Sequence, residues 1–155
     1  SAVLAELLLD RSDLDLVDMG GVGGTLAGNA LSVAATRATL EHVLTDEAFA
    51  RMAKLSERFE AGVRAGIEAH RLPWSVSRLG ARTEYRFISP APRTGTESAA
   101  AADPELEDFL HLYLANRGIL LTPFHNMALM CPDTTEQDVD THTEVFAAAL
   151  AELAG

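Results

Sequence analysis

A glycine-rich segment, GGVGGTLAGN at residues 20–29, is the part of the sequence whose residue types most clearly suggest chemistry. Backbone N–H groups of neighbouring glycines, the hydroxyl of Thr25 and the N-terminus of a following helix can together hold an anion such as a phosphate. The segment is not a dinucleotide-binding fingerprint, because Leu26 stands where the third glycine belongs, and no Walker A Gly-Lys-Ser/Thr follows. A tight turn between two helices is the alternative explanation, since glycine also serves where a chain bends sharply.

His125 and Asn126 form a second candidate site, because they lie side by side between two apolar segments, ILLTPF and MALM. A polar pair in this position can contact a substrate, or it can simply form the turn at the end of a strand. The histidines and the cysteine do not indicate a metal site, because their spacing matches neither C-x-x-C nor H-E-x-x-H. These residues are His42, His70, His111, His125, His142 and Cys131.

Arg82 is a third candidate, in a segment that also contains Arg78 and Arg86. A guanidinium group there can bind a carboxylate through two parallel hydrogen bonds. Cross-strand pairing with Glu84 explains the same arginines at least as well. Nucleophilic catalysis is not indicated, because the sequence contains no G-x-S-x-G motif and no recognisable Cys–His pair.

The elements that must position these residues begin with three predicted helices. Residues 1–10 predict a short helix, and a second helix begins near Leu31. Thr45 and Asp46 supply N-cap oxygens for a third, long helix. The apolar residues of this third helix recur every three or four positions, as in an amphipathic helix. They are Phe49, Met52, Leu55, Phe59, Val63 and Ile67.

Two short strands are predicted on either side of Gly80, with Tyr85 alternating with Glu84 and Arg86. Residues 90–103 predict a loop, which we expect to be the most mobile segment. Asp103 followed by proline then predicts the start of a helix.

ILLTPF and MALM predict two short buried strands, and Thr134 with Gln137 matches the capping box of a last helix. The order of elements predicts an α+β fold, in which a small sheet of antiparallel strands is covered by helices and preceded by a long helical segment.

Composition excludes several classes of function. Twelve basic residues against 23 acidic ones give a net charge of −11, which disfavours binding to nucleic acid. No stretch approaches the roughly 20 apolar residues of a membrane span. The chain begins without a basic leader and contains a single cysteine, Cys131, so we expect a cytoplasmic protein with no membrane partner.

The run GGVGGTLAGNALSVAATRATLEHV resembles a segment of class III (fold-type I) aminotransferases, which depend on pyridoxal 5'-phosphate (PLP), and of glutamate-1-semialdehyde aminomutases. That segment reads roughly G-T-x-x-G-N-P-L-x-x-A-A-x-x-A-T-L. The matching residues are Gly24, Thr25, Gly28, Asn29, Leu31, Ala34, Ala35, Ala38, Thr39 and Leu40. Ala30 replaces the proline of the family. The segments LGARTEYRF, LYLANRGILLTPFHNMALM and DVDTHTEVF extend the resemblance over essentially the whole chain, which is identified as the C-terminal portion of such an enzyme.

The resemblance implies a cofactor site shared by two subunits of a homodimer. In this family the threonine of G-T-x-x-G-N reaches the PLP phosphate of the neighbouring subunit, which implies this role for Thr25, with Gly23 and Gly24 permitting close approach. It also implies that residues 1–29 end the large PLP domain, that residues 30–70 are connecting helices, and that residues 71–155 form the small α+β domain. An amino acid or amine would be the substrate, and Arg82, His125 and Asn126 are the candidates for contacting it.

The lysine that holds PLP as a Schiff base in this family lies upstream of the glycine-rich segment. Lys54 is the only lysine here, and its place within RMAKLSERFE predicts an exposed helical surface. We therefore expect a parent enzyme that transfers or migrates an amino group, and expect this chain alone to be inactive. The alternative is a free-standing, non-catalytic module that binds a ligand or another subunit.

Overall fold

The computed structural model describes residues 28–122 and 125–154 and divides the chain after Val43 into two compact units. The described part of the first unit is helix α3 (Ala30–His42). The second unit contains α4 (Asp46–Ala69), β1 (Ser75–Leu79), β2 (Arg82–Arg86), α5 (Gly95–Ala100), α6 (Pro104–Ala115), β3 (Met127–Leu129) and α7 (Glu136–Ala154). None of the described helices is long and apolar enough to cross a membrane.

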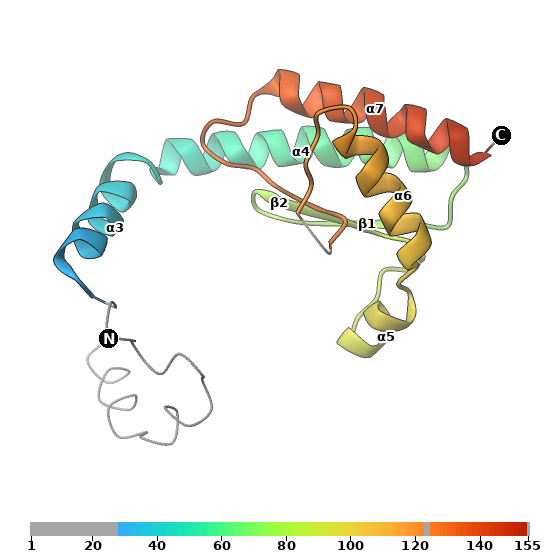
Figure 1. Ribbon diagram of the computed structural model, residues 1–155, viewed down its shortest axis with the longest axis horizontal. Helices are drawn as coiled ribbons and strands as arrows, with labels where there is room; N and C mark the ends of the chain where they lie inside the picture. Colours follow the sequence, from blue (N-terminus) through green and yellow to red (C-terminus); the bar gives the residue numbers. More distant parts are fainter. Residues whose placement is uncertain (1–27, 123–124, 155) are drawn as a thin grey trace. The chain divides into compact units, whose positions relative to one another are not determined.

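The three strands form one antiparallel sheet in the order β1-β2-β3, and α4 covers one face of it (Figure 1). Helix α7 lies along α4, and α6 packs against α7. The sheet and its helical cover confirm the predicted α+β class. The predicted short helix at residues 1–10 lies outside the described residues.

Helix α4 confirms the long amphipathic helix, with Thr45 as the N-cap that accepts a hydrogen bond from Ala48 N. Its predicted apolar positions from Met52 to Ile67 are buried in the core. Phe49 is the exception, because its side chain remains 51% exposed and burial along α4 begins only at Met52. The residue spacing predicted the buried stripe correctly but not the point where it starts.

Two glycines allow α4 and α7 to approach each other closely. A Cβ atom added to Gly62 would lie 2.7 Å from Thr143 Cγ2, and one added to Gly66 would lie 3.1 Å from Leu150 Cδ1. Real Cβ atoms do not tolerate the first of these separations, so a side chain at residue 62 would require α7 or the Thr143 side chain to move.

The face of the sheet that meets α4 combines aromatic packing with one buried polar pair. Tyr85 is fully buried, and its ring lies 5.2 Å from the Phe146 ring of α7. Thr83 Oγ1 lies 2.7 Å from Ser56 Oγ of α4, so the two buried hydroxyl groups satisfy each other. The buried residues of β2 thereby fix the sheet to both helices.

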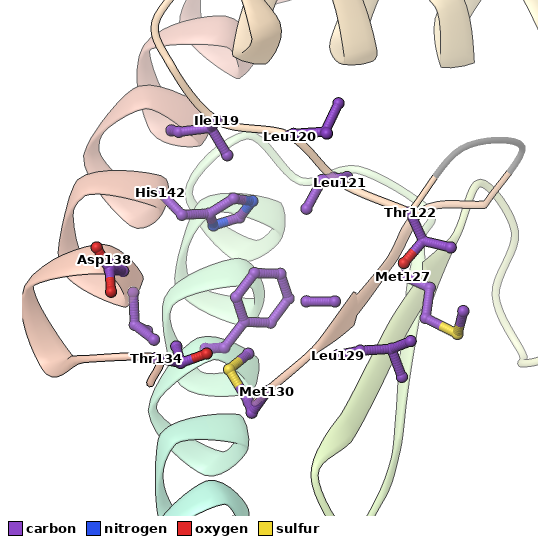
Figure 2. A pocket seen from close by; sticks show the side chains of 13 residues that line it. Ile119, Leu120, Leu121, Thr122, Met127, Leu129, Met130, Thr134, Asp138 and His142 are labelled. Carbon is purple, nitrogen blue, oxygen red and sulfur yellow. The ribbon is translucent and has the colours of Figure 1, made fainter. Parts of the chain in front are cut away.

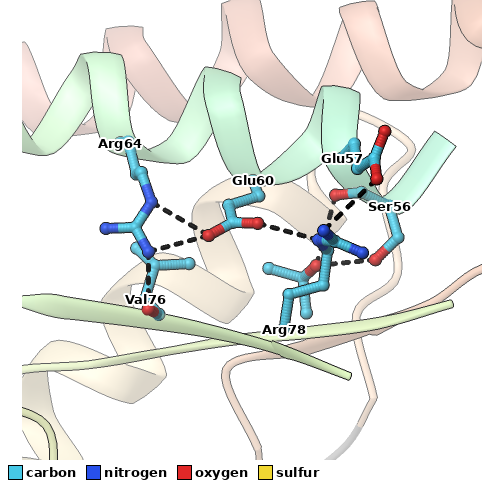
Figure 3. Close-up of polar contacts among 7 residues, drawn as sticks. Ser56, Glu57, Glu60, Arg64, Val76 and Arg78 are labelled. Carbon is cyan, nitrogen blue, oxygen red and sulfur yellow. Dashed lines mark hydrogen bonds and ion pairs between the residues drawn. The ribbon is translucent and has the colours of Figure 1, made fainter. Parts of the chain in front are cut away.

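Glu60 ties α4 to β1 at the edge of this interface (Figure 3). Its Oε1 accepts from Arg64 and its Oε2 from Arg78, at 2.7 and 2.9 Å. Burial raises the pKa of the Glu60 carboxyl, but the hydrogen bonds from the two arginines outweigh this effect and hold the pKa below its usual value. Arg78 is therefore a structural residue that anchors β1 to α4.

The predicted loop at residues 90–103 contains a helix, α5, so the prediction was wrong in its middle part. Thr94 is the N-cap and accepts from Glu97 N, while the Glu97 carboxylate accepts from Arg93 N. The spacing T-x-x-E is that of a capping box, although the Glu97 carboxylate binds the N–H of the residue before the N-cap. The signal was present in the sequence but was outweighed by the surrounding prolines and alanines.

ILLTPF does not form a strand over the described residues 119–122. The chain leaves α6 through Gly118, which has a left-handed φ of 81°, and Ile119 N donates to Leu114 O to close the helix. MALM forms β3 as predicted, and β3 pairs with β2. An apolar run alone could not reveal which of the two segments finds a strand partner.

The cap of α7 lies one residue beyond the predicted position. Thr135 Oγ1 accepts from Asp138 N, and Asp138 Oδ2 accepts from Thr135 N, which makes a reciprocal box. Thr134 instead accepts from Cys131 N in the preceding turn. Both Thr134 and Thr135 have the spacing of an N-cap residue. Thr135 caps α7 because the hydroxyl of Thr134 is used in the turn at residues 131–134.

Replacing Gly62 by alanine is expected to destabilise the second unit by about 1–2 kcal/mol, although alanine is the better helix former by about 1 kcal/mol. The reason is the clash with Thr143. Urea unfolding of G62A, T143A and the double variant measures this, and T143A should restore much of the lost stability. Gly95→Ala is the control, because no atom lies within 4 Å of an added Cβ there. A G62A chain as stable as the wild type would contradict this packing.

His142 is expected to make the stability of this fold depend on pH. Burial lowers its pKa from 6.5 to about 4, because no water solvates the charged ring. Between pH 6.5 and 4 the unfolded chain therefore binds a proton that the folded chain does not, and stability falls by about 3 kcal/mol as pH decreases through this range. Below pH 4 both states are protonated and this loss levels off.

Urea unfolding at a series of pH values, compared between the wild type and His142→Phe, isolates this effect. The variant is expected to lose less stability between pH 6.5 and 4, whereas His42→Gln, at an exposed position of α3, should follow the wild type. Parallel pH profiles for the wild type and His142→Phe would show that His142 does not cause the decline.

Candidate functional site

The residues proposed to hold a phosphate, Gly23, Gly24 and Thr25, lie outside the described residues, so only the end of the glycine-rich segment is seen. Gly28 has a left-handed φ of 70°, which favours glycine. Asn29 follows as the N-cap of α3, and its Oδ1 accepts from Ser32 N at 3.0 Å. The N-terminus of α3 is thus capped by the chain's own side chain.

Arg82 lies on the face of the sheet opposite α4. Leu79 and Leu129 are its partners in register on the two neighbouring strands, and both are exposed. Arg82 Nη2 donates to Glu84 Oε2 at 2.6 Å. An ion pair with Glu84 is therefore formed, but within β2 and not across strands as predicted. It leaves Arg82 accessible from the open face of the sheet.

His125 is brought to the same carboxylate. Its Nδ1 lies 3.8 Å from Glu84 Oε1, and Arg86 Nη2 lies 2.7 Å from the same oxygen. Neither contact has the geometry of a hydrogen bond, since Oε1 is buried without a hydrogen-bond partner. Two of the predicted substrate residues, Arg82 and His125, thus meet at Glu84.

Asn126 is buried rather than exposed to a substrate. Its carbonyl accepts from Tyr85 N at 3.0 Å and continues the pairing of β3 with β2. Its side-chain Oδ1 is buried with no partner in the described structure. Asn126 therefore positions His125 through the backbone, and its amide oxygen remains able to accept a hydrogen bond.

Glu84 is the residue that the sequence interpretation did not recognise as central. Strand alternation assigns it to the open face of the sheet, yet it is only 7% exposed because Arg82 and Arg86 fold over it. The signal was the spacing R-x-E-x-R, which places all three side chains on one face of a strand.

Lys54 lies exposed on α4, as predicted. It makes no hydrogen bond or ion pair with the described residues and lines a cleft of about 560 Å³ with Arg51, Arg58 and the loop before α7. Arg58 is already paired with Asp140 through two hydrogen bonds. A lysine that forms a Schiff base works from a buried, desolvated setting, and Lys54 is exposed in the described structure.

A second cavity, of about 220 Å³, lies between α4, α7, β3 and the segment after α6 (Figure 2). Ile119, Leu120 and Leu121 line one side, and His142 lines the other. Both ring nitrogens of His142 are buried without partners. Arg82, His125 and Asn126 do not line this cavity, so it is separate from the cluster at Glu84.

A metal site is not formed by the described residues, because no three His, Cys, Asp or Glu side chains converge there. The charged groups along β2 instead suit an organic anion. Arg82 and Arg86 carry two positive charges against the single negative charge of Glu84. A carboxylate is the natural partner for such a group.

No protein-family model matches the sequence. Curated relatives do: glutamate-1-semialdehyde 2,1-aminomutase of Thermomicrobium roseum is 33% identical over 132 residues, which cover 84% of this chain and 30% of the relative. The enzyme of the same name from Opitutus terrae is also 33% identical over 132 residues, covering 84% of this chain and 31% of the relative. The chain thus spans about 30% of the length of the curated relatives that it matches.

Solved structures agree with the curated relatives. A glutamate-1-semialdehyde aminomutase from Pseudomonas aeruginosa, crystallised in complex with PMP, is 54% identical with a TM-score of 0.83, covering 88% of this chain and 30% of that one. An omega-transaminase from Sphaerobacter thermophilus shares the fold at 24% identity and a TM-score of 0.73. The match covers 86% of this chain and 30% of the transaminase chain.

All of these similar proteins are enzymes in which the matched region is one part of a longer chain, so a free-standing, non-catalytic module is not favoured. The chain belongs to the class III, fold-type I family of PLP-dependent aminotransferases and glutamate-1-semialdehyde aminomutases, and it corresponds to the C-terminal portion of its members.

Proposed function

We propose that this chain is the C-terminal part of a cytoplasmic enzyme that uses PLP to transfer or migrate the amino group of an amino acid or amine. The observation that carries the proposal is the 54% identity, over 88% of the chain, to the Pseudomonas aeruginosa aminomutase crystallised with PMP. Identity at this level supports a common chemistry as well as a common fold.

PLP would supply the electron-withdrawing ring that stabilises negative charge at the carbon bearing the amino group. The contribution of this chain would be to hold the cofactor phosphate of the partner subunit in a homodimer. The Thr25 hydroxyl and the N–H groups of Gly23 and Gly24 are suitable donors for a phosphate dianion. The described end of the segment fits this role, because Gly28 has a left-handed φ and Asn29 caps α3 directly after it.

The second unit would carry the substrate side of the site. Arg82 and His125, gathered at Glu84, would contact the substrate, and Asn126 would support His125 from the buried side. In this arrangement residues 1–29 end the large domain, residues 30–70 connect the domains and residues 71–155 form the small domain. Helix α4 packs on the small sheet and would therefore belong to the small domain. The segment that connects the two domains would then be only α3 and residues 43–45.

The Schiff-base lysine would lie in another part of the parent enzyme, since Lys54 is exposed on α4. The chain alone would then be inactive. Choice between aminotransferase and aminomutase chemistry would depend on the complete substrate pocket, to which this chain contributes one wall.

Reduction of the full-length enzyme with borohydride in the presence of PLP is expected to fix the cofactor on a lysine outside these 155 residues. Peptide mass spectrometry identifies the lysine. Lys54→Arg in the full-length enzyme should leave the absorbance of bound PLP and the rate of amino transfer unchanged. If Lys54→Arg abolished both, Lys54 would be the cofactor lysine and this assignment would fail.

Thr25→Val in the full-length enzyme is expected to weaken PLP binding about tenfold, the value of one hydrogen bond to a charged group. Titration of the apoenzyme with PLP, followed by absorbance, measures the effect. Thr39→Val is the matched control, because Thr39 Oγ1 donates to Ala35 O within α3. Equal affinities for T25V and T39V would remove Thr25 from the phosphate site.

A further inference from the structure

Glu84 is a carboxylate that lies on the open face of the sheet and is nevertheless buried. Its side chain is 9% exposed, whereas Arg82, in the same row of the sheet, is 46% exposed. A buried carboxylate requires compensating charge, because burial removes the water that stabilises it. Arg82 and Arg86 supply this charge from positions two residues before and after it on β2.

The two arginines are held by different oxygens of the one carboxylate. Arg82 Nη2 lies 2.6 Å from Oε2, and Arg86 Nη2 lies 2.7 Å from Oε1. Arg82 Nε also donates to Met127 Sδ of β3, at 2.6 Å. Long arginine side chains lose freedom when they are held at one position. Glu84 thus fixes both of them along a single strand.

Neither arginine has used all of its donors. A guanidinium group carries five N–H bonds, and the Nη1 atoms of Arg82 and Arg86 have no partner among the described residues. The group of Arg82, Glu84 and Arg86 has a net charge of +1, in a chain whose total is −11. An anion that approaches the open face therefore meets a local positive site with hydrogen-bond donors to spare.

We propose that Glu84 is a positioning residue of the substrate site: it holds Arg82 and Arg86 so that their Nη1 groups together bind the carboxylate of the substrate. This inference rests on the proposed function, in which Arg82 lies on the substrate side. It adds Arg86 as a second binding arginine and assigns to Glu84 the pre-organisation of both.

Pre-organisation predicts a specific kinetic pattern. Glu84→Gln keeps the size of the side chain but removes the charge that holds both arginines, so they lose their common anchor. The KM of the full-length enzyme for an amino-acid substrate is expected to rise about tenfold or more, with kcat changed far less, because the lost contact serves binding. The inhibition constant of propionate, a simple carboxylate that competes with the substrate, should rise in parallel.

Glu60→Gln is the matched control, since Glu60 also joins two arginines, Arg64 and Arg78, but on the α4 side of the sheet (Figure 3). It is expected to lower the melting temperature without changing KM or propionate inhibition. Arg86→Gln is the second variant, in case Glu84→Gln does not fold, and it should reproduce the rise in KM. The affinity for PLP should remain unchanged in all three variants.

The outcomes separate this inference from the function on which it rests. A wild-type enzyme that neither binds PLP nor transfers an amino group would overturn the proposed function. An active wild type with unchanged KM and propionate inhibition in Glu84→Gln and Arg86→Gln would overturn only the role of Glu84. A KM that changes in Glu60→Gln as much as in Glu84→Gln would assign both carboxylates to stability alone.

Discussion

Close contact between α4 and α7 over the sheet is the constraint on which the rest of the second unit depends. Gly62 and Gly66 remove side chains from α4 where Thr143 and Leu150 of α7 approach. The close approach lets Phe146 reach past α4 to the ring of Tyr85 in the sheet. Side chains at these two positions would push the helices apart and weaken the packing of Phe146 on Tyr85 of the central strand.

Glu60 and Glu84 each pair with two arginines, but they lie on opposite faces of that sheet. Glu60 binds Arg64 and Arg78 where α4 meets β1, so this carboxylate holds a helix to a strand. Glu84 joins Arg82 and Arg86 on the opposite face, which the described residues leave open, next to the exposed Leu79 and Leu129. A polar network beside exposed apolar residues suits a surface that meets another part of the protein or a substrate.

The family gives this arrangement a functional meaning. A chain that spans about 30% of its relatives can contribute one wall of an active site without containing the site. The glycine-rich segment and the charged row of β2 belong to different units. In the proposed function the first would meet the cofactor phosphate and the second a substrate carboxylate. The proposed function thus assigns binding groups to two units of this chain and the reacting lysine to another part of the parent enzyme.

Local patterns in the sequence determined most elements of the fold. The N-caps Thr45 and Asp103, the strands around Gly80 and the amphipathic spacing of α4 could be predicted because each signal lies within a few residues. The resemblance at residues 24–40 and the order of elements indicated the family, which the relatives confirm. The T-x-x-E box of α5 was equally local and was missed because alanines and prolines obscured it.

Only the tertiary structure decided the features that require a partner from a distant part of the chain. Residues 119–122 are as apolar as a strand, but β3 is the segment that pairs with β2. The turn that ends α6 is closed by the hydrogen bond from Ile119 N to Leu114 O, and residues 119–122 follow it without forming a strand. Phe49 continues the apolar stripe of α4, yet its side chain remains exposed, and Met52 is the first residue of the stripe that is buried. The sequence by itself determined the family, the helices α3, α4, α6 and α7, and the R-x-E-x-R row. The fold decided that Glu84 is buried and that His125 joins it, because burial and proximity depend on how strands pair and not on the order of residues within one strand.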